Sequence, residues 1–134
     1  MRVKNYRHVA RSSAAVAAVG TAYASGKRIS LETSYWPDGQ PFRGGLQSLS
    51  VYVSSISSAA SITWRLTRDT DGDESIITDV TGALTTGITT ATDGSVNFKL
   101  NYDVSLESGD TFYLWIKTDA GTVTVDQAVL LWGE

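Results

Sequence analysis

The sequence predicts an all-β protein, an antiparallel two-sheet sandwich of the jelly-roll type with about eight strands. Apolar and polar residues alternate with a period of two through most of the chain, which is typical of strands with one buried face. Turn signals containing glycine separate these alternating runs at regular intervals. The 134 residues are 42% hydrophobic, so they are enough for one domain with its own core.

Each strand is expected where an alternating run lies between two turn signals. In the run at 60–68, for example, Ile62, Trp64 and Leu66 alternate with polar side chains. The strands are expected near residues 28–34, 46–54, 60–68, 74–80, 83–90, 95–103, 111–118 and 122–132. The turn signals between them are Asp71-Gly72, Asp93-Gly94, Ser108-Gly109 and Ala120-Gly121. The side chains expected in the core are Leu49, Val51, Ile62, Trp64, Leu66, Val96, Phe98, Leu100, Phe112, Leu114 and Ile116.

The charge distribution divides the chain into a basic, alanine-rich N-terminal arm at 1–24 and a sandwich body at 25–134. Residues 1–28 hold six basic and no acidic side chains, whereas the rest of the chain holds five basic and fourteen acidic ones. Alanine favours helix, so the stretch 12–19 is expected either as a short helix or as an extended strand that joins a neighbour. A basic arm of this kind suits an acidic protein surface, the alternative being a solvated terminus. We therefore expect residues 1–24 to pack against other subunits rather than against their own body, so that a chain without residues 1–20 would still fold.

The same arm has some features of a targeting segment. Ala22-Tyr23-Ala24 resembles a cleavage site for a signal peptide. The apolar stretch before it is short, lacks Leu, Ile and Phe, and is interrupted by Gly20, so we do not expect cleavage. No stretch approaches the roughly 20 apolar residues of a membrane-spanning helix.

Few residues could carry chemistry. The acidic run at 69–74 could supply oxygen ligands to calcium, but its glycine falls at the wrong position for an EF-hand loop, and a simple hairpin turn explains it. The chain has no cysteine, and its single histidine, His8, lies in the arm. The usual nucleophile–base pairs and nitrogen–sulfur zinc sites therefore cannot be assembled in the body. We expect no enzyme activity, no metal and no cofactor.

Several aromatic side chains could form a sugar platform. They are Tyr35, Trp36, Tyr52, Tyr113, Trp115 and Trp132. Tyr113 and Trp115 alternate with apolar residues and should lie on the outer face of their strand, where contact with another subunit or burial in the core is favoured over sugar binding. Nucleic acid is disfavoured as a partner, because the acidic body would repel phosphates.

One group of short motifs resembles a known family. The chain resembles small β-sandwich structural proteins of tailed bacteriophages over about residues 20–132. The similar stretches are Thr21–Ile29, Gly44–Leu49, Ile62–Leu66 through Asp71-Gly72-Asp73, and Leu114–Thr122. Lys27 stands where that pattern tends to have Asp, so no site residue is transferred from the family. The resemblance implies a virion protein on the capsid surface, in particular a capsid decoration (cement) protein that forms trimers on the outer shell. The alternative is a carbohydrate- or receptor-binding module of a tail or fibre.

These considerations give a set of expected contact residues. The partners would be the major capsid protein or other virion subunits. The chain is also expected to form a homo-oligomer, most readily a trimer, and not to contact a membrane. The side chains expected to contact the capsid or other subunits are Arg2, Lys4, Arg7, Arg11, Tyr23, Lys27, Arg28, Tyr113 and Trp115.

Overall fold

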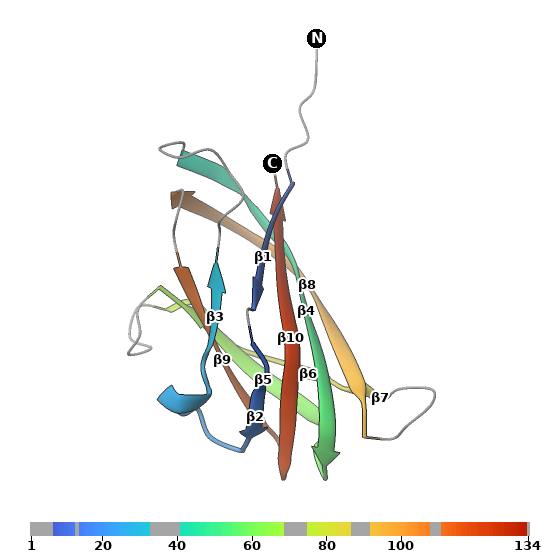
Figure 1. Cartoon of the computed structure of the whole chain (residues 1–134). Helices are drawn as coiled ribbons and strands as arrows, with labels where there is room; N and C mark the ends of the chain where they lie inside the picture. The colour runs from blue at the N-terminus through green and yellow to red at the C-terminus, as the bar shows by residue number, and fades with distance from the viewer. Residues whose placement is uncertain are drawn as a thin grey trace.

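The computed structural model describes residues 7–12, 14–32, 41–68, 75–86, 92–107 and 111–133, and these form an antiparallel all-β fold (Figure 1). This confirms the all-β, antiparallel part of the prediction. The strands are β1 (Arg7–Ser12), β2 (Val16–Val19), β3 (Ile29–Glu32), β4 (Pro41–Ser57), β5 (Ser61–Thr67), β6 (Ser75–Ala83), β7 (Thr85–Thr86), β8 (Gly94–Glu107), β9 (Thr111–Thr118) and β10 (Thr122–Gly133). A 3-10 turn, η1 (Ser25–Lys27), precedes β3.

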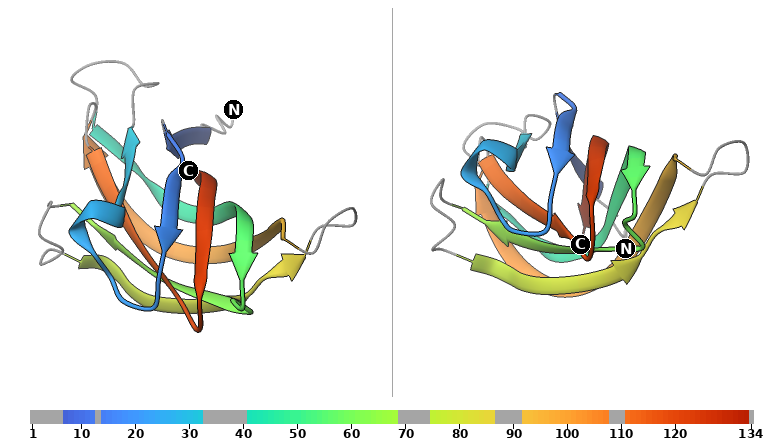
Figure 2. Two further views of the ribbon diagram at one scale, coloured as in Figure 1. Left: turned by 60° about the horizontal axis from the view of Figure 1, so that its bottom comes forward. Right: turned by 90° about the horizontal axis from the view of Figure 1, so that it is seen from below.

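The strands follow one hydrogen-bonded path in the order β6-β5-β9-β3-β1-β10-β4-β8-β7, with β2 also pairing with β10. The sheet curls, so that β5 and β6 lie across from β10 and β4 (Figure 2). The expected division into two separate sheets is not confirmed, because β1 pairs with both β3 and β10 and joins the two halves. The pairing of β1 with β3 is short and involves two residue pairs.

The space enclosed by the curled sheet is filled by the apolar side chains that alternate along the strands. Of the eleven side chains expected in the core, nine are buried, whereas Val96 and Leu100 are partly buried and pack against the others. Trp64 of β5 meets Phe98 of β8 across the core, with ring centroids 5.6 Å apart and the rings tilted by 66°. This edge-to-face contact links the two halves of the sheet.

The turn between β9 and β10 shows why glycine is needed at one position. Gly121 has a φ of +62°, and a Cβ there would collide with the carbonyl oxygen of Ser57. The Thr118 hydroxyl donates a 3.0 Å hydrogen bond to the Gly121 carbonyl, and Asp119 Oδ1 accepts from the backbone N–H groups of Ala60 and Ser61 at 2.9 and 3.1 Å. The turn therefore also fixes the start of β5.

The N-terminal segment differs from the expected arm. Its β1 and β2 are extended strands, which was one of the two conformations expected, the other being a short helix. The segment pairs with its own body, however, since Arg7–Arg11 lie opposite Gly133–Val129 of β10. Val19 and Val16 of β2 lie opposite Val123 and Val125. The expectation that residues 1–24 pack against other subunits rather than their own body is therefore wrong for β1 and β2. The reason is that β3 and β10 would each have unpaired backbone N–H and C=O groups along one edge without β1 and β2.

Candidate functional site

The outer face of β9 and β5 gathers the charged and aromatic side chains that alternate with the core. Tyr113, Trp115 and Lys117 point away from the core because Phe112, Leu114 and Ile116 point into it. The register places Thr67, Arg65 and Thr63 of β5 beside these three residues, in that order. Two neighbouring strands thus present one mixed basic and aromatic row.

Arg28 covers one end of this row. Its guanidinium carbon lies 5.4 Å from the centre of the Tyr113 ring and 6.0 Å from that of Trp115, which is within the range of a cation–π contact. The indole N–H of Trp115 donates a 2.9 Å hydrogen bond to the Thr67 hydroxyl. Only 6% of Trp115 is exposed. Its own chain therefore covers the Trp115 ring, which is one of the two alternatives, burial or subunit contact, that were favoured over an exposed sugar platform.

Tyr23 occupies the other end of the row. The segment after β2 is tied to the end of β9, because the Gly20 carbonyl accepts a 2.8 Å hydrogen bond from the Thr118 N–H. This places the Tyr23 ring 4.9 Å from the Arg65 guanidinium carbon and 4.6 Å from Lys117 Nζ. The Tyr23 hydroxyl donates a 2.7 Å hydrogen bond to Asp79 Oδ1 of β6. Arg65 Nη2 lies 3.6 Å from the same oxygen.

The protonation states of this pair follow from their surroundings. Burial, and then the hydrogen bond to Asp79, raise the pKa of Tyr23 above its usual range. The hydrogen bond from Tyr23, followed by the charges of Arg65 and Lys117, lowers the pKa of Asp79. At neutral pH the Tyr23 hydroxyl is therefore protonated and donates the hydrogen bond, and the Asp79 carboxylate is charged. Asp79 also has a φ of +51°, which is unusual for a residue other than glycine.

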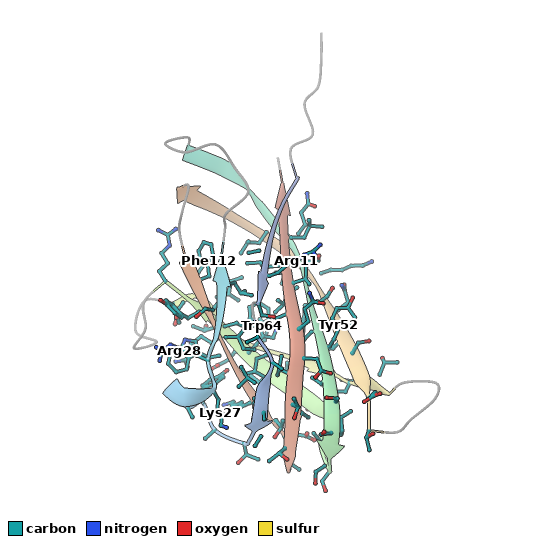
Figure 3. All side chains as sticks on the ribbon, viewed as in Figure 1. Arg11, Lys27, Arg28, Tyr52, Trp64 and Phe112 are labelled. Carbon is teal, nitrogen blue, oxygen red and sulfur yellow. The ribbon has the colours of Figure 1, made fainter. Side chains whose placement is uncertain are left out.

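We call this region the basic-aromatic surface and define it by Tyr23, Arg28, Arg65, Tyr113 and Lys117. This surface has three cationic side chains and, among the described residues, one neighbouring carboxylate, Asp79, so it carries a local excess of positive charge. The whole chain, in contrast, has a formal net charge of −3. The Arg65 side chain is 30% exposed, so the surface is partly open to solvent. Figure 3 shows Arg28 on one side of the molecule and Tyr52 on the other.

Of the other expected contact residues, Arg11 and Lys27 lie away from this surface. Arg2 and Lys4 lie outside the described residues, and Arg7 is described only by its backbone, opposite Gly133 in the sheet. Arg11 is exposed on β1. Lys27 Nζ donates a 2.7 Å hydrogen bond to the Ala17 carbonyl, so this side chain ties η1 to β2.

The sequence analysis missed Arg65, Lys117 and Asp79. The alternation along β5 and β9 contained a signal, because Arg65 and Lys117 have the outward positions next to Trp64 and Ile116. The alternation could not show that β5 pairs with β9, nor that the Tyr23 ring lies against side chains of both strands.

Metal-binding and membrane-spanning features bear on other kinds of function. Among the residues that the structure describes, no three His, Cys, Asp or Glu side chains gather in a way that could hold a metal ion. The acidic run at 69–74 lies outside those residues. Within the described part of the chain, no helix is both long and apolar enough to cross a membrane.

Comparison with known proteins does not assign the chain to a family. No family model matches the chain, and no curated protein matches it. One similar solved structure is isomalto-dextranase from Arthrobacter globiformis T6, in complex with panose, with 11% sequence identity and a TM-score of 0.43. The match covers 94% of this chain but 23% of that enzyme. At this TM-score the match carries no argument about fold or activity.

Proposed function

We propose that the chain is a non-enzymatic virion structural protein, a capsid decoration protein that binds the outer shell of a tailed bacteriophage and stabilises it. The observation that carries this proposal is the basic-aromatic surface on the outside of β9 and β5. Its partner would be the major capsid protein or another virion subunit. The motifs similar to phage β-sandwich proteins support the same assignment.

The proposal includes a jelly-roll fold. It is supported by the weakest connection in the sheet path, the two residue pairs of β1 and β3. Cutting the path there leaves β6-β5-β9-β3 in one group and β1-β10-β4-β8-β7 in the other. The chain passes repeatedly between these groups, and this alternation supports the proposed two-sheet jelly roll.

The chemistry of the basic-aromatic surface suits an acidic protein face. Arg28 and Arg65 lie over aromatic rings, so their guanidinium groups are held in place before a partner arrives. Partly exposed ion pairs contribute little each, and their main effect is to steer and orient the approach. The aromatic rings would supply the buried contact area. We further propose that several copies, trimers first, bind together on the shell.

Binding to capsid shells tests the proposal. Purified protein is mixed with tailed-phage shells assembled without it, and the mixture is separated on a sucrose gradient. The wild type is expected to sediment with the shells. The double variant Arg65→Glu with Lys117→Glu should lose this binding, most visibly at low salt. Lys99→Glu is the matched control, because Lys99 is an exposed lysine on β8. Wild type that stays at the top of the gradient, or equal loss in the control, would overturn the proposal.

A second candidate function is carbohydrate or receptor binding through the outer face of β4, β8 and β10. Tyr52 is 47% exposed there and lies opposite Gln127 and Ser95 in the sheet. Asn97 Nδ2 donates a 2.6 Å hydrogen bond to Ser50 Oγ beside it. An exposed ring flanked by amides and hydroxyls suits stacking on a sugar. Glycan-array binding that Tyr52→Ala abolishes would favour this candidate, and no binding by the wild type would exclude it.

A further inference from the structure

The basic-aromatic surface already holds one carboxylate, which the chain itself supplies. Asp79 Oδ1 accepts the 2.7 Å hydrogen bond from the Tyr23 hydroxyl and lies 3.6 Å from Arg65 Nη2. A carboxylate can accept hydrogen bonds from both of these donors and also balances the charge of the guanidinium group. The contact within the chain therefore indicates which ligand chemistry suits this surface.

A β-bulge brings Asp79 to this position. The register of β6 against β5 shifts around Arg65, so that Thr78 and Asp79 both lie opposite this one residue. Asp79 has a φ of +51° there, which is unfavourable for a residue other than glycine. Bulges often re-aim a side chain beside a functional site, and backbone strain of this kind is concentrated at ligand-binding positions. The strained position is thus an observation separate from the charges that also points to a binding site.

The carboxylate of Asp79 does not balance the cations around it. Lys117 Nζ lies 4.6 Å from the centre of the Tyr23 ring and forms no ion pair within 4 Å with any of the described residues. Arg65 Nε is buried without a hydrogen-bond partner in the described part of the chain. The side chains of Arg65 and Asp79 are 30% and 53% exposed. A ligand from solvent can therefore reach both the guanidinium group and the carboxylate that lies beside it.

We propose that Arg65 and Lys117 bind a carboxylate side chain from an acidic segment of the protein partner, and that Asp79 competes with this carboxylate for Arg65. The inference rests on the proposed function and names the group that the capsid partner presents. At 3.6 Å the ion pair between Asp79 and Arg65 is longer than a hydrogen bond. The partner would replace this long ion pair, while Asp79 keeps its hydrogen bond to Tyr23.

A protein partner is favoured over a nucleic acid. The whole chain has a formal net charge of −3, so it would repel a long run of phosphates. Two neighbouring cations match one carboxylate side chain in charge and in size. Asp79 then acts as an intramolecular competitor that weakens the binding of acidic segments at this site.

Removal of the Asp79 charge tests the proposal. Binding of a dye-labelled hexaglutamate peptide to the full chain is measured by fluorescence anisotropy at low salt, with hexaglutamine as the uncharged probe. Asp79→Asn should bind hexaglutamate roughly two- to fivefold more tightly than the wild type, and Lys117→Gln should bind it more weakly by a similar factor. Neither change should affect hexaglutamine. If Asp79→Asn does not fold, Asp79→Gly replaces it, since glycine accommodates the positive φ.

The matched control is Asp126→Asn, which changes the net charge by the same amount. Asp126 is an exposed residue of β10, a strand that lies across the core from β5 and β6 (Figure 2). This variant should bind hexaglutamate as the wild type does. An equal gain in both variants, or weaker binding by Asp79→Asn, would overturn the proposal. Tighter binding of a short single-stranded DNA than of hexaglutamate, with the same dependence on Lys117, would overturn the assignment to a protein carboxylate.

The sucrose-gradient experiment on the same variants separates this inference from the proposed function. A chain that binds hexaglutamate as expected but does not sediment with shells would overturn the capsid partner and support the carboxylate site. A chain that sediments with shells, and whose binding of hexaglutamate is the same in the wild type and in Asp79→Asn, would overturn the competition by Asp79 alone.

Discussion

The Tyr23 hydroxyl donates a 2.7 Å hydrogen bond to Asp79 Oδ1, and so connects the segment before β3 to β6 across 56 residues of sequence. Arg65 and Lys117 lie against the same tyrosine ring. This pair therefore connects the N-terminal segment to the outer face of the sheet, at the end of the basic-aromatic surface that Tyr23 forms.

We expect Tyr23→Phe and Asp79→Asn each to lower the melting temperature by a small amount, because the first removes this hydrogen bond and the second replaces its charged acceptor with a neutral amide oxygen. Asparagine is chosen at Asp79 because it tolerates a positive φ. The double variant should be more stable than the additive sum predicts, since the two residues share one contact. Thermal denaturation at pH 7 measures this. Fully additive losses would show that the residues act independently.

Acid stability should depend on Asp119. The backbone N–H groups of Ala60 and then Ser61 lower the pKa of this carboxyl in the folded chain. The stability that it contributes is therefore present above about pH 4, the range of an unfolded aspartate, and is lost as the pH falls through the lowered pKa. Urea denaturation as a function of pH should show a weaker acid dependence in Asp119→Asn. An unchanged pH dependence would contradict this.

Trp64→Ala should lower the free energy of unfolding by roughly 3–5 kcal/mol, because it opens a cavity between β5 and β8. Trp64→Phe should cost less, since Trp64 Nε1 has no hydrogen-bond partner to lose among the described residues. Tyr52→Ala is the control at an exposed position, where substitutions usually change stability by about 0.5 kcal/mol or less. Chemical denaturation measures all three. Similar losses for Trp64→Ala and Tyr52→Ala would contradict the assigned core.

Gly121→Ala should destabilise the β9–β10 turn by roughly 1–3 kcal/mol, because the positive φ is unfavourable for alanine and its Cβ would meet the Ser57 carbonyl. Gly20→Ala is the matched control, since a Cβ there has open space. Both variants are compared by thermal denaturation. Equal melting temperatures would show that the turn relaxes at no cost.

Deletion of residues 1–20 should prevent stable folding. It removes β1 and β2 and leaves the edges of β3 and β10 unpaired. This differs from the expectation based on a free arm, in which the truncated body stays folded. Circular dichroism with heating measures the outcome. A truncated chain that unfolds cooperatively at the wild-type temperature would show that the N-terminal strands add little.

The core could be predicted in detail because alternation is a local property. Trp64, Phe98 and Leu114 each lie at inward positions of their own strands, and no knowledge of the neighbouring strand was needed to assign them. The glycine of the Ala120-Gly121 turn could be predicted for the same reason, because the backbone of a tight turn limits which residues fit.

The candidate site depends on pairing between distant strands, which local patterns do not encode. Tyr23 was among the expected contact residues and Arg65 was not, yet the Tyr23 ring and the Arg65 guanidinium carbon lie 4.9 Å apart in the fold. Trp115 has an outward position by alternation and is nevertheless buried, because Arg28 and Thr67 come from other elements to cover it.

The sequence by itself therefore determined the all-β class, the inward and outward faces of β4, β5, β8 and β9, and the excess of positive charge at the N-terminus. Only the tertiary structure decided that the N-terminal segment completes the sheet. Alanine and serine give β1 and β2 little preference of their own, so the unpaired backbone edges of β3 and β10 determine their conformation. The same pairing brings Tyr23 to Asp79 and assembles the basic-aromatic surface.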